Sequence, residues 1–192
     1  MGCFALYSCI LKKSYSVDGV EYYCFCTAVA NEKADAYEKA NETVQNGGAG
    51  VVIEEKGRFF VVASVYSNEQ DAKSVANKND GEIYTFRLPS VVTNDKNLAQ
   101  KILEIYNFTI QKTNEFIKYS LAYDTNQESE IVVSAFIENY EKFVKNGQDD
   151  FYLGLASAIS DKTNSVKLRE YAITLLLNAK QFYQDKLSQN GV

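Results

Sequence analysis

Two hydrophobic patterns divide this chain at Pro89, its only proline. Before Pro89, short runs of β-branched and aromatic residues alternate with turn signals, which is typical of β-strands. After Pro89, apolar residues recur every three or four positions, which is typical of amphipathic helices. The pattern therefore predicts an α+β protein, in which a mixed first part is followed by an all-α helical bundle.

The clearest segment of the first part is a predicted β-hairpin followed by a helix. Val51–Ile53 and residues 59–66 are β-rich runs, and Lys56-Gly57 between them supplies turn chemistry. Ser67 and Gln70 have the spacing of a capping box, in which each side chain satisfies a free backbone N–H at a helix start. A helix is expected to begin near Asn68.

The remaining segments complete a strand and helix order of β-α-β-β-α-β. Residues 20–30 form the first predicted strand, and a helix capped by Asn31 runs to the stop at Gly47-Gly48. Gly81 precedes the last strand, residues 82–88. This order predicts a ferredoxin-like fold with both helices on one face of a four-stranded sheet.

The second part is expected to be an antiparallel bundle of four helices. The predicted helices run from Asn94 to about residue 123, from a Thr125/Glu128 capping box to a stop at Gly147, from 150 to 159, and from about 164 to 187. The chain thus divides into an N-terminal arm (1–19), a ferredoxin-like domain (20–89) and a helical domain (94–192). The intervening Ser90–Asn94 segment is too short a linker for free movement, so the two domains should pack together.

Composition narrows the range of functions. The formal net charge is −5 and the pI is near 4.9, which disfavours nucleic acid as a partner. The chain has no histidine, which excludes Ser-His-Asp triads, histidine general bases and histidine-containing zinc sites. The adjacent carboxylates Glu54-Glu55 and Asp149-Asp150 are explained by loop and helix-start positions. We predict no catalytic residue, no metal site and no cofactor, and we expect that the protein is not an enzyme.

The four cysteines all lie within the first 26 residues. Cys24 and Cys26 are two apart on a predicted strand and so share a face, where we expect them to pack as buried thiols. A disulfide elsewhere among the four, which include Cys3 and Cys9, and a metal site are the alternatives.

Residues 2–11 form an apolar run about half as long as the ~20 residues that a membrane-spanning helix needs. Three interpretations remain open: an edge strand or docking arm, the remnant of an anchor helix that begins upstream, and a lipid-modified Cys3.

The block from Gly47 to Val75 resembles the second half of the SPOR domain, the sporulation-related repeat, in its Firmicute form with a helical C-terminal region. The resemblance covers about residues 20–88. It rests on a Gly-Gly after the first helix, an acidic-Gly turn, an aromatic strand and a helix start, which fall on Gly47-Gly48, Glu55-Lys56-Gly57, Phe59-Phe60-Val61, Tyr66 and Ala72.

The resemblance implies a peptidoglycan-binding protein of the cell envelope that recognises glycan strands stripped of their stem peptides, at septa or in sporulation. Glycan strands and another envelope protein are the implied partners. The family binds its ligand on the sheet face opposite the helices. By alternation that face should carry Tyr23, Phe25, Thr27, Phe60, Val62 and Ser64. The opposite set, expected to face the helices, is Cys24, Cys26, Ala28, Phe59, Val61, Ala63 and Val65.

Apolar residues replace polar ones on the predicted ligand face. The family's first strand reads Gln-x-Gly-x-Phe where this chain has Phe25, Thr27 and Val29, and arginine is common where Phe60 stands. Two functions fit such a face. Its aromatic rings could stack on sugars, or the C-terminal helices or a partner could cover it. The second alternative predicts a protein-interaction or scaffold module that has lost glycan binding.

Overall fold

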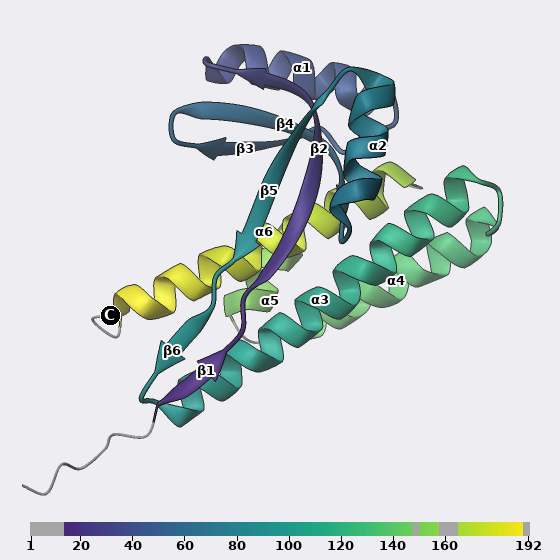
Figure 1. The fold of residues 1–192 in the computed structure, drawn as a ribbon. Helices are drawn as coiled ribbons and strands as arrows, with labels where there is room; N and C mark the ends of the chain where they lie inside the picture. The colour runs from purple at the N-terminus through teal and green to yellow at the C-terminus, as the bar shows by residue number, and fades with distance from the viewer. Residues whose placement is uncertain (1–13, 148–149, 158–164, 190–192) are drawn as a thin grey trace, which may run out of the picture.

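The computed structural model describes residues 14–147, 150–157 and 165–189 (Figure 1). The first part contains β1 (Tyr15–Val17), β2 (Val20–Ala30), α1 (Lys33–Gln45), β3 (Val51–Glu55), β4 (Arg58–Tyr66), α2 (Glu69–Asn79), β5 (Glu82–Leu88) and β6 (Val91–Thr93). The second part contains α3 (Lys96–Asp124), α4 (Glu130–Asn146), α5 (Asp150–Ser157) and α6 (Ser165–Gln189). The prediction of an α+β protein with a helical second part is confirmed.

Four strands form an antiparallel sheet in the order β3-β4-β2-β5. From β2 to β5 the chain follows the predicted order of strand, helix, two strands, helix and strand. The hairpin turns at Lys56 and Gly57, which both have positive φ. Two consecutive left-handed residues match the right-handed twist of the flanking strands, so this turn joins β3 and β4 directly.

The sheet lies between two layers of helices (Figure 1). Against one face, Ala36 and Ala40 of α1 pack on Val61, and Ala76 of α2 packs on Phe25. These small alanines let the helix backbones approach the sheet closely. The other face belongs to a single large core that it shares with α3, α4, α5 and α6.

Gly50 shows how tightly the loop before β3 is held. Its φ is +65°, and a Cβ added there would lie 2.5 Å from the carbonyl oxygen of Ala40. Only glycine accepts both constraints. The end of α1 and the start of β3 are therefore fixed to each other.

The expected linker at Ser90–Asn94 is wrong in part, because Val91–Thr93 forms β6. This strand pairs antiparallel with β1, from Tyr15 opposite Thr93 to Val17 opposite Val91. The small sheet extends the line of β2 and β5 to the start of α3 (Figure 1). The strand at Tyr15–Val17 was not predicted, and the three interpretations of residues 2–11, with the predictions for Cys3 and Cys9, lie outside the described residues.

Several predicted helix starts are displaced by a few residues. The side chain of Asn68, not Ser67, caps α2, and it accepts from the backbone N–H groups of Gln70 and Asp71. Asp95, not Asn94, caps α3. The Thr125/Glu128 box is also wrong, because Thr125 ends α3 and Ser129 caps α4.

The predicted helix ends agree better with the structure. Gly147 follows the last residue of α4 as expected, and the chain after α1 turns at Gly47 with a φ of +85°. The first predicted helix cap, at Asn31, falls one residue early, because α1 begins after Glu32.

Candidate functional site

The six residues predicted to share an open sheet face do not lie on one face. Phe60 and Val62 belong to the core shared with the C-terminal helices, and Val62 is fully buried. Phe25 instead packs beneath α2, next to Ala63 and Ala76. The predicted face is therefore divided between the two helical layers.

Thr27, Ser64 and Tyr23 lie away from the C-terminal core. The hydroxyl of Thr27 is 2.6 Å from that of Thr43 on α1, so Thr27 faces the α1 side. Ser64 lies opposite Phe25 in the β2–β4 ladder, and Tyr23 lies opposite Tyr66. The part of the prediction that put these residues on a face opposite α1 and α2 is wrong.

A break in strand register separates Ser64 from Phe60 and Val62 on β4. The β2–β4 pairing shifts between Phe25 and Cys26 and again between Cys26 and Ala28. Each irregularity interrupts the strict alternation of side chains. As a result Val65, which was expected to face α1 and α2, belongs to the core of the opposite face. Cys24 and Cys26 also belong to that core, because β2 alternates as expected but presents the reverse faces to the two helical layers. Their prediction as buried free thiols is confirmed.

Three polar residues lie together at the edge of the sheet face that the C-terminal helices cover. The Tyr84 hydroxyl donates to the Glu55 carboxylate, and Lys180 of α6 lies 3.9 Å from the same carboxylate. Burial and the adjacent Glu55 raise the pKa of the Tyr84 hydroxyl. The Phe60 ring packs against the Tyr84 ring at a centroid distance of 4.7 Å, with the two ring planes tilted by 33°. Phe60 is thus occupied by contacts within the chain.

A cavity of about 300 Å³, named here the α2–α3 cleft, lies where β3 stops short of the end of β4. β3 pairs with β4 only from Arg58 to Val62, and the carbonyl oxygen of Ala63 accepts the backbone N–H of Ala49. Ser64–Tyr66 pair with β2 on one side only, and no other described strand covers their second edge.

The three residues Ser64–Tyr66 all line the cleft, although their side chains alternate between the two sheet faces. The cleft therefore follows the edge of β4. Its remaining walls come from α2, α3 and α6, through Asp71, Ser74, Val75, Phe116, Ile117, Ser120, Leu121, Asp124, Arg169 and Ala172.

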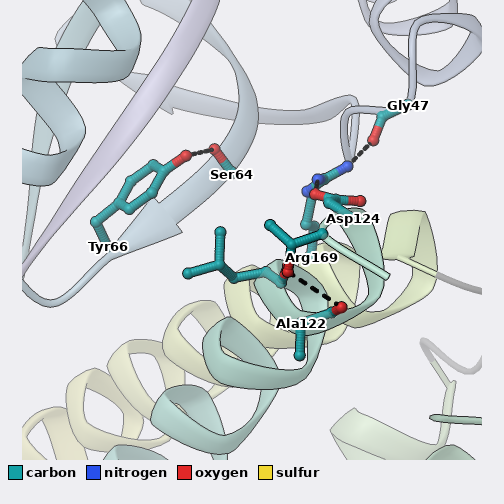
Figure 2. Close-up of polar contacts among 8 residues, drawn as sticks. Gly47, Ser64, Tyr66, Ala122, Asp124 and Arg169 are labelled. Atoms are coloured by element: carbon teal, nitrogen blue, oxygen red, sulfur yellow. Dashed lines mark hydrogen bonds and ion pairs between the residues drawn. The ribbon is translucent and has the colours of Figure 1, made fainter. Parts of the chain in front are cut away.

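The cleft has an apolar floor and a polar rim. Val65, Phe116 and Ala172 at its base are almost fully buried, whereas Leu121 at its mouth is 63% exposed. The Ser64 hydroxyl donates to the Tyr66 hydroxyl at 3.0 Å, along the strand (Figure 2). An apolar floor with a few polar groups around it is the usual composition of a binding site.

Arg169 of α6 connects the two parts of the chain beside the cleft (Figure 2). Its guanidinium donates to the carbonyl oxygen of Gly47, at the end of α1, and to the carboxylate of Asp124, the last residue of α3. The side chain of Arg169 is only 19% exposed. These contacts hold one wall of the cleft in place. They also neutralise the charge of Arg169 within the chain, through the carboxylate of Asp124.

Sequence reasoning missed the cleft residues Asp71, Ser74, Asp124 and Arg169. They come from three helices that are far apart along the chain, and none belongs to a local motif. No sequence signal marks them, because only the folded arrangement brings them together.

The described part of the chain holds no group of three or more cysteine, aspartate and glutamate residues that could bind a metal ion. Within the same ranges, no helix combines the length and apolar character needed to cross a membrane.

Comparisons of the chain with protein-family models, curated proteins and solved structures find no match. The SPOR resemblance and the peptidoglycan-binding function that it implies therefore stay predictions.

Proposed function

We propose that this chain is a non-catalytic protein-interaction module that binds its partner in the α2–α3 cleft. The observation that carries the proposal is the covered sheet face. Tyr22 and Phe86 are each 1% exposed beneath the C-terminal helices, and the Tyr22 hydroxyl donates to Asn114 of α3 at 3.4 Å. With that face occupied, the α2–α3 cleft is a concave surface with an apolar floor that remains open to a partner.

The fold that we propose for residues 20–88 is a ferredoxin-like sheet of the SPOR type. The strand order β3-β4-β2-β5, with every neighbouring pair antiparallel, supports this proposal. The SPOR resemblance points to the cell envelope as the proposed location and to another envelope protein as the proposed partner.

Peptidoglycan binding is the function that the resemblance itself predicts. Phe25 is buried beneath α2, and Phe60 packs against Tyr84 and the shared core, which argues against an aromatic platform at these residues, because a sugar ring cannot stack on a side chain that other residues cover. We therefore expect the folded chain not to sediment with peptidoglycan sacculi, whether or not an amidase has removed their stem peptides. Sedimentation that increases after amidase treatment would favour the glycan-binding function instead.

A random-peptide display selection tests the interaction function directly. The wild-type chain is immobilised, and Ser74→Trp and Asn77→Trp serve as a matched pair of variants. Both positions are exposed on α2, but only Ser74 lines the cleft, which the indole would fill. We expect peptides that bind the wild type and Asn77→Trp but not Ser74→Trp, with unchanged thermal unfolding of both variants. Failure to enrich any peptide, or equal binding to Ser74→Trp, would contradict the proposal.

A further inference from the structure

We infer that the occupant of the α2–α3 cleft is an extended peptide that adds as a strand to the free edge of β4 at Ser64–Tyr66, with an apolar side chain at its centre and a basic side chain beside it. This inference rests on the proposed function and specifies the chemistry of the partner.

The free edge determines the conformation of the occupant. β3 covers β4 up to Val62, and the loop before β3 contributes one more hydrogen bond, from Ala49 to Ala63. Beyond Ala63 the edge of β4 has backbone groups with no strand beside them among the described residues. Such an edge binds an extended chain through main-chain hydrogen bonds, in the place where a longer β3 would lie.

The two helical layers determine where the side chains of the peptide point. Val65 belongs to the core shared with the C-terminal helices, so a residue opposite Val65 would point to the same side. There it meets the apolar floor formed by Phe116 and Ala172. A β-branched or leucine side chain matches this position.

Residues next to the central one would point to the α2 side, because side chains of a strand alternate. On that side the cleft is lined by Asp71, Ser74 and Val75 of α2, together with Tyr66. The Asp71 carboxylate and the hydroxyl groups of Ser74 and Tyr66 suit a polar or charged neighbour whose aliphatic stem can pack on Val75.

The charges of the cleft select a basic neighbour. The guanidinium of Arg169 is already bonded to the carboxylate of Asp124 and to Gly47. Asp71 is exposed and has no ion pair among the described residues. A lysine or arginine of the peptide would therefore find an uncompensated carboxylate at Asp71, whereas an acidic residue would be repelled.

Three fluorescent synthetic peptides of one length test the inference by anisotropy. The first has a central isoleucine flanked by lysine, the second has glutamate in place of lysine, and the third is the lysine peptide with its central backbone amides N-methylated. We expect the lysine peptide to bind the full chain, and the glutamate peptide to bind about tenfold more weakly. N-methylation should weaken binding at least about tenfold, because it removes the donors that pair with β4.

Two variants locate the contacts. Asp71→Asn should lower the affinity for the lysine peptide about threefold. The affinity for the glutamate peptide should not fall, because the substitution removes the carboxylate that repels it. Ser74→Trp should abolish binding, and Asn77→Trp should not. In hydrogen exchange, the backbone amides at the edge of β4 should gain protection when the lysine peptide is bound.

The results separate this inference from the proposed function. Equal binding of the N-methylated peptide, or preference for the glutamate peptide, would overturn the strand-addition inference. If the display selection nevertheless yields a helical or acidic peptide class that Ser74→Trp excludes, the proposed function stands and only the inference fails.

Discussion

Glu141 of α4 and Lys167 of α6 form a largely buried ion pair, with side chains 16% and 10% exposed. The Lys167 Nζ atom lies 2.7 Å from a carboxylate oxygen of Glu141, and the Tyr171 hydroxyl donates to the same carboxylate at 2.6 Å. Burial by itself would raise the pKa of the Glu141 carboxyl, but the hydrogen bonds from Lys167 and Tyr171 lower it below its ordinary value of 4.5.

Glu141→Gln should destabilise the protein by about 3 kcal/mol, because it leaves the Lys167 ammonium buried without a counter-charge. Urea unfolding followed by circular dichroism measures the change. Glu138→Gln, at an exposed position one turn earlier on α4, is the control and should change stability by less than about 0.5 kcal/mol. Equal unfolding free energies of Glu141→Gln and Glu138→Gln would contradict a stabilising role of the Glu141–Lys167 ion pair.

The same carboxylate makes stability depend on acidity. Because the pKa of Glu141 is lower in the folded than in the unfolded chain, its stabilising contribution is fully present above pH 4.5 and is lost as the pH falls through the lower folded value. The difference in unfolding free energy between wild type and Glu141→Gln should therefore shrink below pH 4.5. A difference that stays constant through this range would contradict the assignment.

Cys24 and Cys26 are fully buried, and burial raises the pKa of both thiols, that of Cys26 to about 12. In a Cys3→Ser/Cys9→Ser variant, a disulfide reagent should therefore modify these two thiols at least about a hundredfold more slowly in buffer than in denaturant. Absorbance of the released thiolate measures both rates. Rapid modification of the native variant would mean that β2 opens readily.

At the scale of single elements, helix starts show what local sequence leaves undecided. Ser67 and Asn68 are both good caps, and they are adjacent. Which one caps α2 depends on where the chain leaves β4, and Asn68 is the residue with extended backbone whose side chain accepts from two backbone N–H groups. Cap residues could thus be predicted to within a few positions, but not to the exact residue.

Asn68→Ala should lower the free energy of unfolding by about 1 kcal/mol, because the start of α2 loses its side-chain acceptor. Ser67→Ala is the matched control and should have almost no effect. Thermal or urea unfolding of the pair measures the difference. A larger loss of unfolding free energy from Ser67→Ala than from Asn68→Ala would mean that Ser67 caps α2, as the sequence predicts.

The hairpin could be predicted because its determinants are local. Two β-rich runs on either side of Lys56-Gly57 were sufficient to locate β3 and β4 within about two residues at each end. In contrast, β1 and β6 are three residues each and pair across more than 70 positions, so no local pattern marks them. Their strands form because both segments lie beside α3 in the folded chain.

At the scale of the whole molecule, one core joins the sheet to the helices across the predicted domain boundary at Pro89. Tyr22, Phe86 and Leu88 of the sheet belong to the same buried cluster as Ile102 of α3 and Leu176 of α6. The Tyr106 hydroxyl also donates to the carbonyl oxygen of Pro89 at 2.9 Å. The two predicted parts do pack together.

A fragment of residues 14–93, which lacks the helical part, should not fold cooperatively by itself. It would expose the aromatic and aliphatic side chains that α3 and α6 cover, and the hydrophobic contribution of that area would be lost. Urea unfolding and amide chemical-shift dispersion, compared with the full chain, measure this. A sharp unfolding transition of the fragment would show that the sheet is an independent domain whose face could become free for a ligand.

The sequence by itself determined the kinds of element and nearly all of their order. Strand alternation, helical periodicity and glycine stops act between residues a few positions apart, so they can be read without knowing the fold. They correctly indicated the strand at residues 82–88 and the end of α4 before Gly147.

Only the tertiary structure decided which face of the sheet is covered and where the open cleft lies. The register irregularity between Phe25 and Cys26 puts Phe25 and Val62 on opposite faces, each packed against a different helical layer. The α2–α3 cleft exists because β3 ends before β4 and because Arg169 holds α6 against Gly47 and Asp124. These contacts join residues far apart in the chain, and their energies do not appear in any local pattern.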